Sequence, residues 1–501
     1  MTVEQAIQKL DELQKKKHAL RHASGLIYYD GVTTAPEGAS AGRGETLGVL
    51  SSLEYELMTN PETEELLKFL NEHKDELTPQ KARETVMLTR EYDQISKIPQ
   101  DEFVEYQIMI NEAQDVWHKA KRNNDYPSFA PYIDKISKTL RKFASYFNPD
   151  EKPYNVWLDL YERGLTMEKL DVFFGKLKEV IVPLISKIQE KGDVIDTSFI
   201  KQDFPIDKQR ILSDYLMEVM CIDRKYCGIG ESEHPFTINF NKNDVRITTK
   251  YHQDDMTNSM YSVIHEGGHA LYELHTGDEL QYTCLASGIS MGVHESQSRL
   301  FENFIGRSKP FINLIYPKLQ ELFPEQLKDV SAHQFYLAVN KSVPSLIRIE
   351  ADELTYCLHI MVRYEIEKML LEGSVNVNEL PDVWARLMKE YLGVDVPDDA
   401  HGVLQDSHWS GGSMGYFPSY AIGTAYAAQI LHRMKQDIDV DEVIESGNLK
   451  PIVDWLSEHI YKYGSMMDPD ELLLKCCGEP FDPTYFTDYL AGKFSEIYDL
   501  K

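Results

Sequence analysis

Hydrophobic residues recur every three or four positions along most of this chain, which is the period of a helix with one apolar face. The pattern predicts helices over residues 45–58, 62–73, 79–96, 100–123, 132–146 and 167–191. It resumes over residues 311–323, 331–343, 346–371 and 381–391. Thr2 and Gln5 have the spacing of a capping box, and the glycine-rich segment 31–44 is expected to be a long loop. The sequence therefore predicts a mainly α protein.

The period changes once, between residues 234 and 249. Residues 234–240 and 244–249 alternate apolar and polar side chains, and Asn241-Lys242-Asn243 between them is typical of a turn. We predict a β-hairpin here. Its edge would offer unpaired backbone groups to an extended peptide; alternatively, the hairpin only closes the core.

The next helix, predicted over residues 256–274, contains the motif His265-Glu266-Gly267-Gly268-His269. Residues four apart lie on one helical face, so both imidazoles can reach one metal ion while Glu266 flanks it. The two adjacent glycines weaken the helix by about 2 kcal/mol relative to two alanines. Close approach of another backbone, or of a substrate, would explain them.

A third ligand is expected, because catalytic zinc usually takes three protein ligands and a water. Glu295 lies 26 residues after His269 and next to His294, on a segment that reads as another helix start and can fold back onto the first. The alternative is a solvated glutamate on a polar helix face. We predict one Zn²⁺ per chain, with Co²⁺ or Mn²⁺ as substitutes.

Further polar residues are candidates for substrate contacts. Arg348 and Asp352 lie four apart in the predicted helix 346–371. They are expected to form a surface ion pair with each other. Alternatively, Arg348 binds a carboxylate of the substrate. Arg246, on the hairpin face opposite its apolar neighbours, is a second such candidate. His408 and Tyr420, in a stretch rich in glycine and aromatic residues, are suitable hydrogen-bond donors to an oxyanion or else structural residues.

The composition limits the classes of binding partner and the cellular location that we expect. The chain has 501 residues and a formal net charge of −29, without a compensating basic patch, which argues against nucleic acid and anionic membranes as partners. No secretory signal and no run of about 18 apolar residues is present. The six cysteines form no C-x-x-C pair, and we interpret them as reduced thiols in a cytoplasmic protein.

Six motifs together resemble one family, the carboxypeptidase Taq family of zinc-dependent metallocarboxypeptidases. They occur in order within about 175 residues, and the helical N-terminal half is also similar to that family. The motifs are His234-Pro235-Phe236, residues 244–248, the residues from His265 to His269, residues 294–297, residues 347–352 and residues 402–409.

The resemblance implies one peptidase domain over residues 1–501, with a neurolysin-like helical body in two lobes around a deep cleft. Residues 1–200 would form one wall of this cleft, and residues 201–501 would carry the metal site. It also implies a homodimer that removes C-terminal amino acids from peptides with broad specificity, proline usually excepted.

Residue roles follow from the same resemblance. His265, His269 and Glu295 would be the metal ligands, and Glu266 the general base. Arg348, with Arg246, would recognise the C-terminal carboxylate of the peptide, and Tyr420 would support the oxyanion.

The chain departs from the pattern of the wider peptidase clan at one informative position. Relatives often have an acidic residue four positions after the glutamate ligand, where this chain has Arg299, so the partners of the metal ligands are not predicted. Two alternatives stay open, an oligopeptide endopeptidase with the same metal site and a helical scaffold protein with a relic site.

Overall fold

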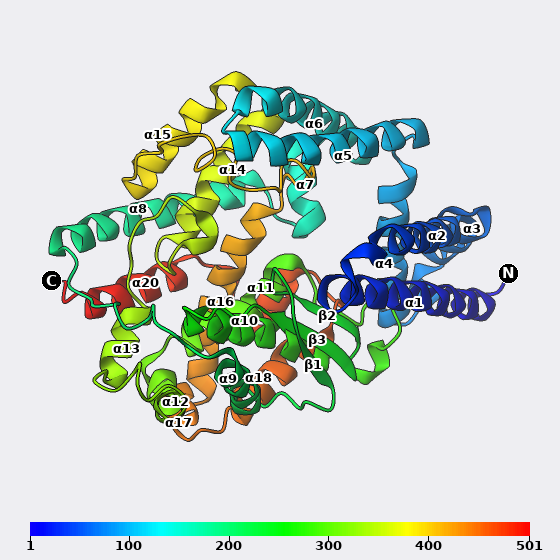
Figure 1. Ribbon diagram of the computed structural model, residues 1–501. Coiled ribbons are helices and arrows are strands. Elements are labelled where there is room, and N and C mark those ends of the chain that lie inside the picture. The colour runs from blue at the N-terminus through cyan, green and yellow to red at the C-terminus, as the bar shows by residue number, and fades with distance from the viewer. Residues whose placement is uncertain (501) are drawn as a thin grey trace.

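The computed structural model describes residues 1–500, and Figure 1 shows a mainly helical body around one small sheet. The prediction of a mainly α protein is confirmed. The two termini lie on opposite sides of the molecule. Within residues 1–500, no helix is both long and apolar enough to cross a membrane.

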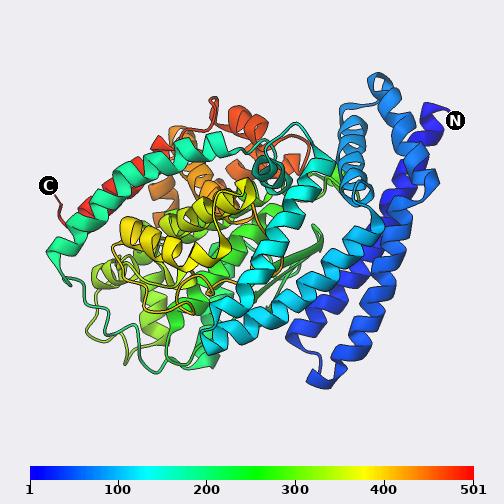
Figure 2. The ribbon, with the colours of Figure 1, turned by 90° about the horizontal axis from the view of Figure 1, so that it is seen from above.

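The first helices form a small bundle with a hydrophobic core of its own, and Figure 2 shows it along one side of the body. Thr2 and Gln5 make the predicted capping box. The prediction of a long loop over residues 31–44 is wrong, because glycine costs a helix about 1 kcal/mol but does not forbid it. Only residues 34–36, which end at Pro36, lie outside helical turns. The helices are α1 (Val3–Thr33), α2 (Ser40–Thr59), α3 (Pro61–Glu72) and α4 (Pro79–Ser96), with short 3₁₀ turns at Glu37–Ala39 and Lys74–Glu76.

The large hydrophobic core lies in the remainder of the chain. The helices before the sheet are α5 (Gln100–Asn123), α6 (Tyr126–Phe147), α7 (Pro153–Tyr161), α8 (Met167–Lys191) and α9 (Ile206–Val219). Those after it are α10 (Met256–Leu274), α11 (Met291–Arg299), α12 (Lys309–Leu322), α13 (Ala332–Val339), α14 (Tyr356–Glu372), α15 (Leu380–Leu392), α16 (Phe417–Asp437), α17 (Val440–Glu445), α18 (Lys450–His459), α19 (Pro469–Cys477) and α20 (Thr484–Ile497). Short 3₁₀ turns lie at Asp278–Leu280, Arg348–Glu350, Val377–Glu379 and Tyr461–Tyr463.

The sheet described within residues 1–500 has three strands in the order β1-β3-β2. They are β1 (Cys227–Glu231), β2 (Thr237–Asn241) and β3 (Asp244–Thr249), and β2 and β3 form the predicted antiparallel hairpin. β1 pairs with β3 in parallel and was not predicted, because two of its five residues are glycines, which have low β propensity. β2 is consequently an edge strand.

The chain packs α10, α11 and α16 unusually close together. A Cβ atom on Gly268 of α10 would lie 2.6 Å from the backbone oxygen of Gln297 in α11. A Cβ atom on Gly423 of α16 would lie 2.6 Å from the backbone oxygen of Gly292, on the other side of α11. Close approach of a second backbone therefore accounts for Gly268, one of the two glycines in the metal-motif helix.

The predicted helix over residues 346–371 begins only at Tyr356, so the expected ion pair between Arg348 and Asp352 is wrong. Asp352 instead accepts hydrogen bonds from the backbone N–H groups of Val343, Leu354 and Thr355 at 2.9–3.1 Å. A carboxylate that satisfies backbone donors in this way favours a turn over a helix. Arg348 therefore lies on a separate 3₁₀ turn.

Candidate metal centre

Three side chains from two helices bring ligating atoms together beside the sheet. His265 and His269 lie one turn apart on α10, and Glu295 lies on α11. Glu295 Oε2 is 3.8 Å from His265 Nε2 and 3.6 Å from His269 Nε2, and the three atoms form a group suited to a metal ion. Tetrahedral zinc with ligands at about 2.1 Å requires separations of about 3.4 Å, so the residues present fit this metal.

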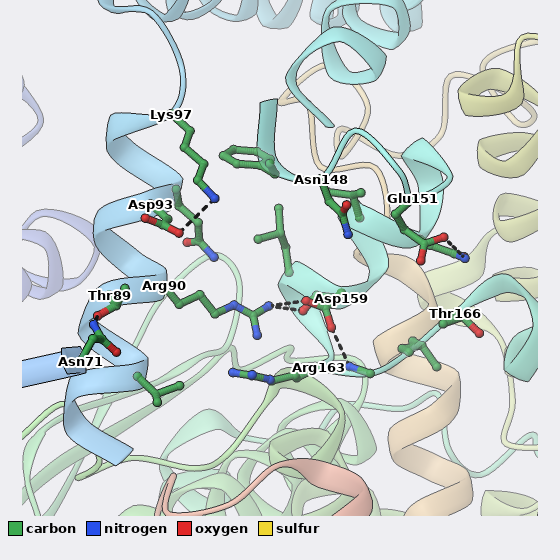
Figure 3. Close-up of a pocket in the computed structure, with 18 residues that line it drawn as sticks. Asn71, Thr89, Arg90, Asp93, Lys97, Asn148, Glu151, Asp159, Arg163 and Thr166 are labelled. Atoms are coloured by element: carbon green, nitrogen blue, oxygen red, sulfur yellow. Dashed lines mark hydrogen bonds and ion pairs between the residues drawn. The ribbon is translucent and has the colours of Figure 1, made fainter. Parts of the chain in front are cut away.

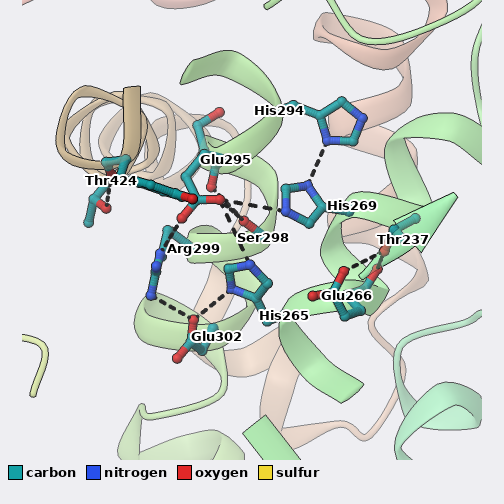
Figure 4. A network of polar contacts seen from close by, with 12 residues as sticks. Thr237, His265, Glu266, His269, His294, Glu295, Ser298, Arg299, Glu302 and Thr424 are labelled. Carbon is teal, nitrogen blue, oxygen red and sulfur yellow. Dashed lines mark hydrogen bonds and ion pairs between the residues drawn. The ribbon is translucent and has the colours of Figure 1, made fainter. Parts of the chain in front are cut away.

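The other nitrogen of each imidazole has a partner of its own. His265 Nδ1 lies 2.8 Å from Glu302 Oε2, and His269 Nδ1 lies 2.6 Å from His294 Nδ1. His294 Nε2 lies in turn 2.7 Å from Glu273 Oε1. Since Nδ1 is engaged on both rings, Nε2 is the atom that each ring presents to the centre, as Figure 4 shows.

The protonation state of His269 favours metal binding. Burial lowers the pKa of His269 to about 3, which keeps its imidazole neutral. The consistent assignment of protons places one on His269 Nδ1, donated to His294 Nδ1, and one on His294 Nε2, donated to Glu273. His269 Nε2 then carries a free lone pair.

Arg299 links the carboxylates on both sides of the centre. It donates from Nε to Glu295 Oε1 at 2.6 Å and from Nη1 to Glu302 Oε2 at 3.0 Å. Although burial opposes the shift, Arg299 and His265 lower the pKa of Glu302 to about 2. Glu302 lies in a π-helical segment, Leu300–Ile305, that continues α11. Both carboxylates are therefore ionised at neutral pH, with an arginine between them.

Glu266 is held at the edge of the cavity in front of these residues. Its Oε2 accepts a hydrogen bond of 2.6 Å from the hydroxyl of Thr237 on β2, and its side chain is almost fully buried. Burial raises the pKa of this carboxyl. A raised pKa makes a carboxylate a better proton acceptor at neutral pH.

The cavity has a volume of about 330 Å³ and is closed by residues from β2, α11 and the start of α16. Tyr420, a predicted site residue, is in its wall, and burial raises the pKa of its hydroxyl. His408 lies behind this wall, with its ring 4.4 Å from Phe417 and 6.4 Å from Tyr420. Among the described residues, its Nδ1 has no hydrogen-bond partner. Tyr416 and Ser419 complete this side.

The two predicted arginines lie apart from each other. Arg348 is 6% exposed and donates to Asp406 Oδ1 from Nε and Nη2, at 3.1 and 2.8 Å, and from Nη1 to the hydroxyl of Tyr356 at 3.1 Å. Its guanidinium lies 5.5 Å from the ring of Tyr420. Arg246 is on β3, where it pairs with Asp244 and covers the ring of Tyr29 at 5.2 Å. Neither arginine is in the wall of the cavity.

Sequence reasoning missed the partners of the metal-site residues. Glu302 had a usable signal, because it lies seven positions after Glu295, and positions i and i+7 share one helical face. His294 was adjacent to a predicted ligand but received no role. Thr237 and Glu273 had no signal, since their contacts join segments that are distant in the sequence.

These observations define a class of protein, a helical metal-dependent hydrolase with two histidines and a glutamate at its centre. The model of the carboxypeptidase Taq (M32) metallopeptidase family matches residues 9–494, and the chain belongs to this family. It is therefore a metallocarboxypeptidase that depends on a metal ion. The resemblance drawn from the six motifs is confirmed.

Known carboxypeptidases are similar to this chain in sequence and in structure over nearly its whole length. Carboxypeptidase 1 of Bacillus subtilis (strain 168) is 40% identical, with 98% of both chains covered. Thermostable carboxypeptidase 1 of Pyrococcus furiosus is 35% identical, with 95% of this chain and 96% of that protein covered. The crystal structure of the M32 carboxypeptidase from Deinococcus radiodurans R1 superimposes with a TM-score of 0.96 at 31% identity, over 99% of this chain and 100% of that one.

Proposed function

We propose that this protein removes C-terminal amino acids of many kinds from peptides, with His265, His269 and Glu295 as the ligands of one Zn²⁺. The observation that carries the proposal is the convergence of two Nε2 atoms and one carboxylate oxygen at 3.6 and 3.8 Å. A metal ion held there would lower the pKa of water and polarise the last peptide carbonyl. Co²⁺ or Mn²⁺ would substitute for Zn²⁺.

Glu266 is the general base in this proposal. Its buried carboxylate lies on the metal helix and opens onto the cavity, while the hydroxyl of Thr237 fixes its orientation. It would accept a proton from the attacking water at the free carboxylate oxygen and pass it to the leaving amine. Tyr420 and His408 would donate hydrogen bonds to the developing oxyanion, a role that the position of Tyr420 in the cavity wall supports.

Arg348 is the proposed recogniser of the C-terminal carboxylate. Arg348 and Arg363 share one carboxylate, that of Asp406, which leaves one positive charge uncompensated behind the tyrosines of the cavity. A peptide carboxylate would compensate this charge. Arg246 remains a second proposed contact, farther along the sheet.

Two substitutions test these roles. Glu266→Gln keeps the size of the side chain, so we expect kcat to fall by about 10²–10⁴-fold while the metal content stays at one equivalent. Near-normal turnover by this variant would refute the role of Glu266. Arg348→Gln should raise KM for a free peptide far more than for its C-terminally amidated twin.

The same pair of peptides distinguishes a carboxypeptidase from an endopeptidase using the same site. Equal cleavage of the free and the amidated peptide by the wild-type enzyme would contradict recognition of the carboxylate. Time-resolved mass spectrometry of a peptide mixture, with and without a chelator, would at the same time establish the breadth of specificity and the need for a metal.

Assembly and location are proposed from the family resemblance and the composition. We expect a homodimer, which sedimentation velocity would detect at roughly twice the mass of the 57.8 kDa chain. We also expect a cytoplasmic protein, which cell fractionation would test.

A further inference from the structure

A second cavity, of about 510 Å³, lies between α4 of the N-terminal bundle and α7 of the body. Its volume is in the range of small-molecule sites, which is about 300–1,000 Å³. Its wall shares no residue with the cavity in front of the metal centre. The end of α7 and the residues just after it separate the two cavities. Leu160 and Arg163 line this cavity, while the ring of Tyr161 lies 5.2 Å from the ring of Tyr416, which lines the other.

One end of this cavity carries an excess of positive charge. Arg90 pairs with Asp159 at 3.0 Å, while Arg163 and Arg83 pair with the single carboxylate of Asp468 at 3.0 and 2.7 Å. Three guanidinium groups thus share two carboxylates. A local positive excess is notable in a chain whose net charge is −29.

The guanidinium groups facing the cavity have donors to spare. Among the described residues, Arg90 donates hydrogen bonds only from Nη2, and Arg163 pairs through Nε with Asp468 at 3.0 Å. Figure 3 shows Arg90 and Arg163 lying side by side across one end of the cavity. Burial lowers the pKa of Arg90, and the neighbouring charge of Arg163 adds to this effect. Two adjacent guanidinium groups with unused N–H donors suit a carboxylate.

The end of the cavity away from Arg90 and Arg163 carries a negative charge. Glu151 lies there, and its Oε1 accepts hydrogen bonds from the backbone N–H of Lys152 at 2.8 Å and from Asn155 at 2.9 Å. Within residues 1–500, no cation pairs with this carboxylate. The wall between the two ends includes apolar side chains, which are Val86, Phe147, Val156, Leu160 and Leu165.

We propose that the cavity between α4 and α7 binds a short peptide with free termini and an apolar side chain. Its carboxylate is held by Arg90 and Arg163, and its ammonium group faces Glu151. Its side chain contacts the apolar wall. This site is distinct from the position of the residue being cleaved, and the proposal does not depend on the role of Glu266.

Calorimetric titration of the metal-free, full-length protein tests the proposal, because no hydrolysis occurs without the metal. The ligands are the dipeptide Ala-Leu, its C-terminal amide, L-leucine and inorganic phosphate. We expect saturable binding of Ala-Leu and weaker binding of leucine, because leucine carries both charged groups on one carbon and cannot reach both ends of the cavity. The amide of Ala-Leu, which lacks the carboxylate, should bind at least tenfold more weakly than Ala-Leu. Tighter binding of phosphate than of either zwitterion would overturn the ligand class.

Variants locate the binding. Arg163→Gln should weaken it at least tenfold, and Gln94→Trp, which fills the cavity without breaking an ion pair, should abolish it. Arg386→Gln, on the exposed face of α15, is the matched control and should bind normally, with circular dichroism confirming that each variant is folded. Binding that survives Gln94→Trp but is lost in Arg348→Gln would place the ligand at the metal centre and overturn the proposal, as would the absence of binding at millimolar ligand.

Discussion

Replacing Glu302 by glutamine tests whether the network around the metal ligands contributes to metal affinity. In the wild type, Glu302 holds His265 Nδ1 at 2.8 Å and Arg299 Nη1 at 3.0 Å. Glutamine keeps an oxygen that can accept the imidazole proton, but it removes the negative charge. A hydrogen bond to a charged group contributes roughly 1–1.5 kcal/mol more than a neutral one, and loss of such partners weakens metal binding by about 10–100-fold.

We therefore expect Glu302→Gln to weaken Zn²⁺ binding about tenfold, or by about 1.4 kcal/mol. Competition with a chromophoric chelator, applied to the metal-free protein, measures this change independently of activity. Glu458→Gln is the matched control, because Glu458 is exposed and pairs only with Lys462 on the surface. A folded Glu302→Gln variant with the metal affinity of the wild type would show that this carboxylate does not orient His265.

Further predictions concern packing and pH. Gly268→Ala should destabilise the protein by about 1–2 kcal/mol in denaturant unfolding, because its Cβ would lie 2.6 Å from a backbone oxygen of α11; Gly42→Ala, with open space around it, should instead stabilise slightly. Burial raises the pKa of Glu367 to about 7, from about 4.5 in the unfolded chain, so ionisation of this group lowers the stability of the wild type as pH rises between those values. Glu367→Gln lacks this ionisation, and its stability relative to the wild type should increase over that interval by roughly 3 kcal/mol; a difference independent of pH would contradict this assignment.

The sequence predicted the centre of the site because its residues lie on regular elements. His265 and His269 are related by one helical turn, so their shared face follows from their spacing alone. Glu295 was predicted as the third ligand because catalytic zinc usually takes three protein ligands and a second helix began at a suitable distance, and the structure places its carboxylate beside the two imidazoles. The hairpin was found from its alternation, which the structure reproduces, with Val245 and Ile247 buried on one face and Arg246 on the other.

Other features depend on tertiary contacts that spacing does not encode. Arg348 was expected on a helix, but Asp352 takes the backbone donors that a helix would use, and Arg348 pairs with Asp406, 58 positions away. Thr237 reaches Glu266 only because the edge strand lies against α10. The prediction of a loop over residues 31–44 was wrong for the opposite reason. The low helix propensity of its glycines was given too much weight.

Arg299 explains how Glu295 can present one carboxylate oxygen to the centre and keep the other away from it. A carboxylate can bind a metal ion through one oxygen or both, and both would occupy a position needed by water or by the peptide carbonyl. In this chain Arg299 Nε holds Glu295 Oε1 at 2.6 Å, while only Oε2 faces the two imidazoles. In the proposed site, Glu295 would therefore ligate the metal ion through Oε2 alone. Arg299 stands at a position that is often acidic in the wider clan, and the carboxylate that contacts His265 in this chain is that of Glu302.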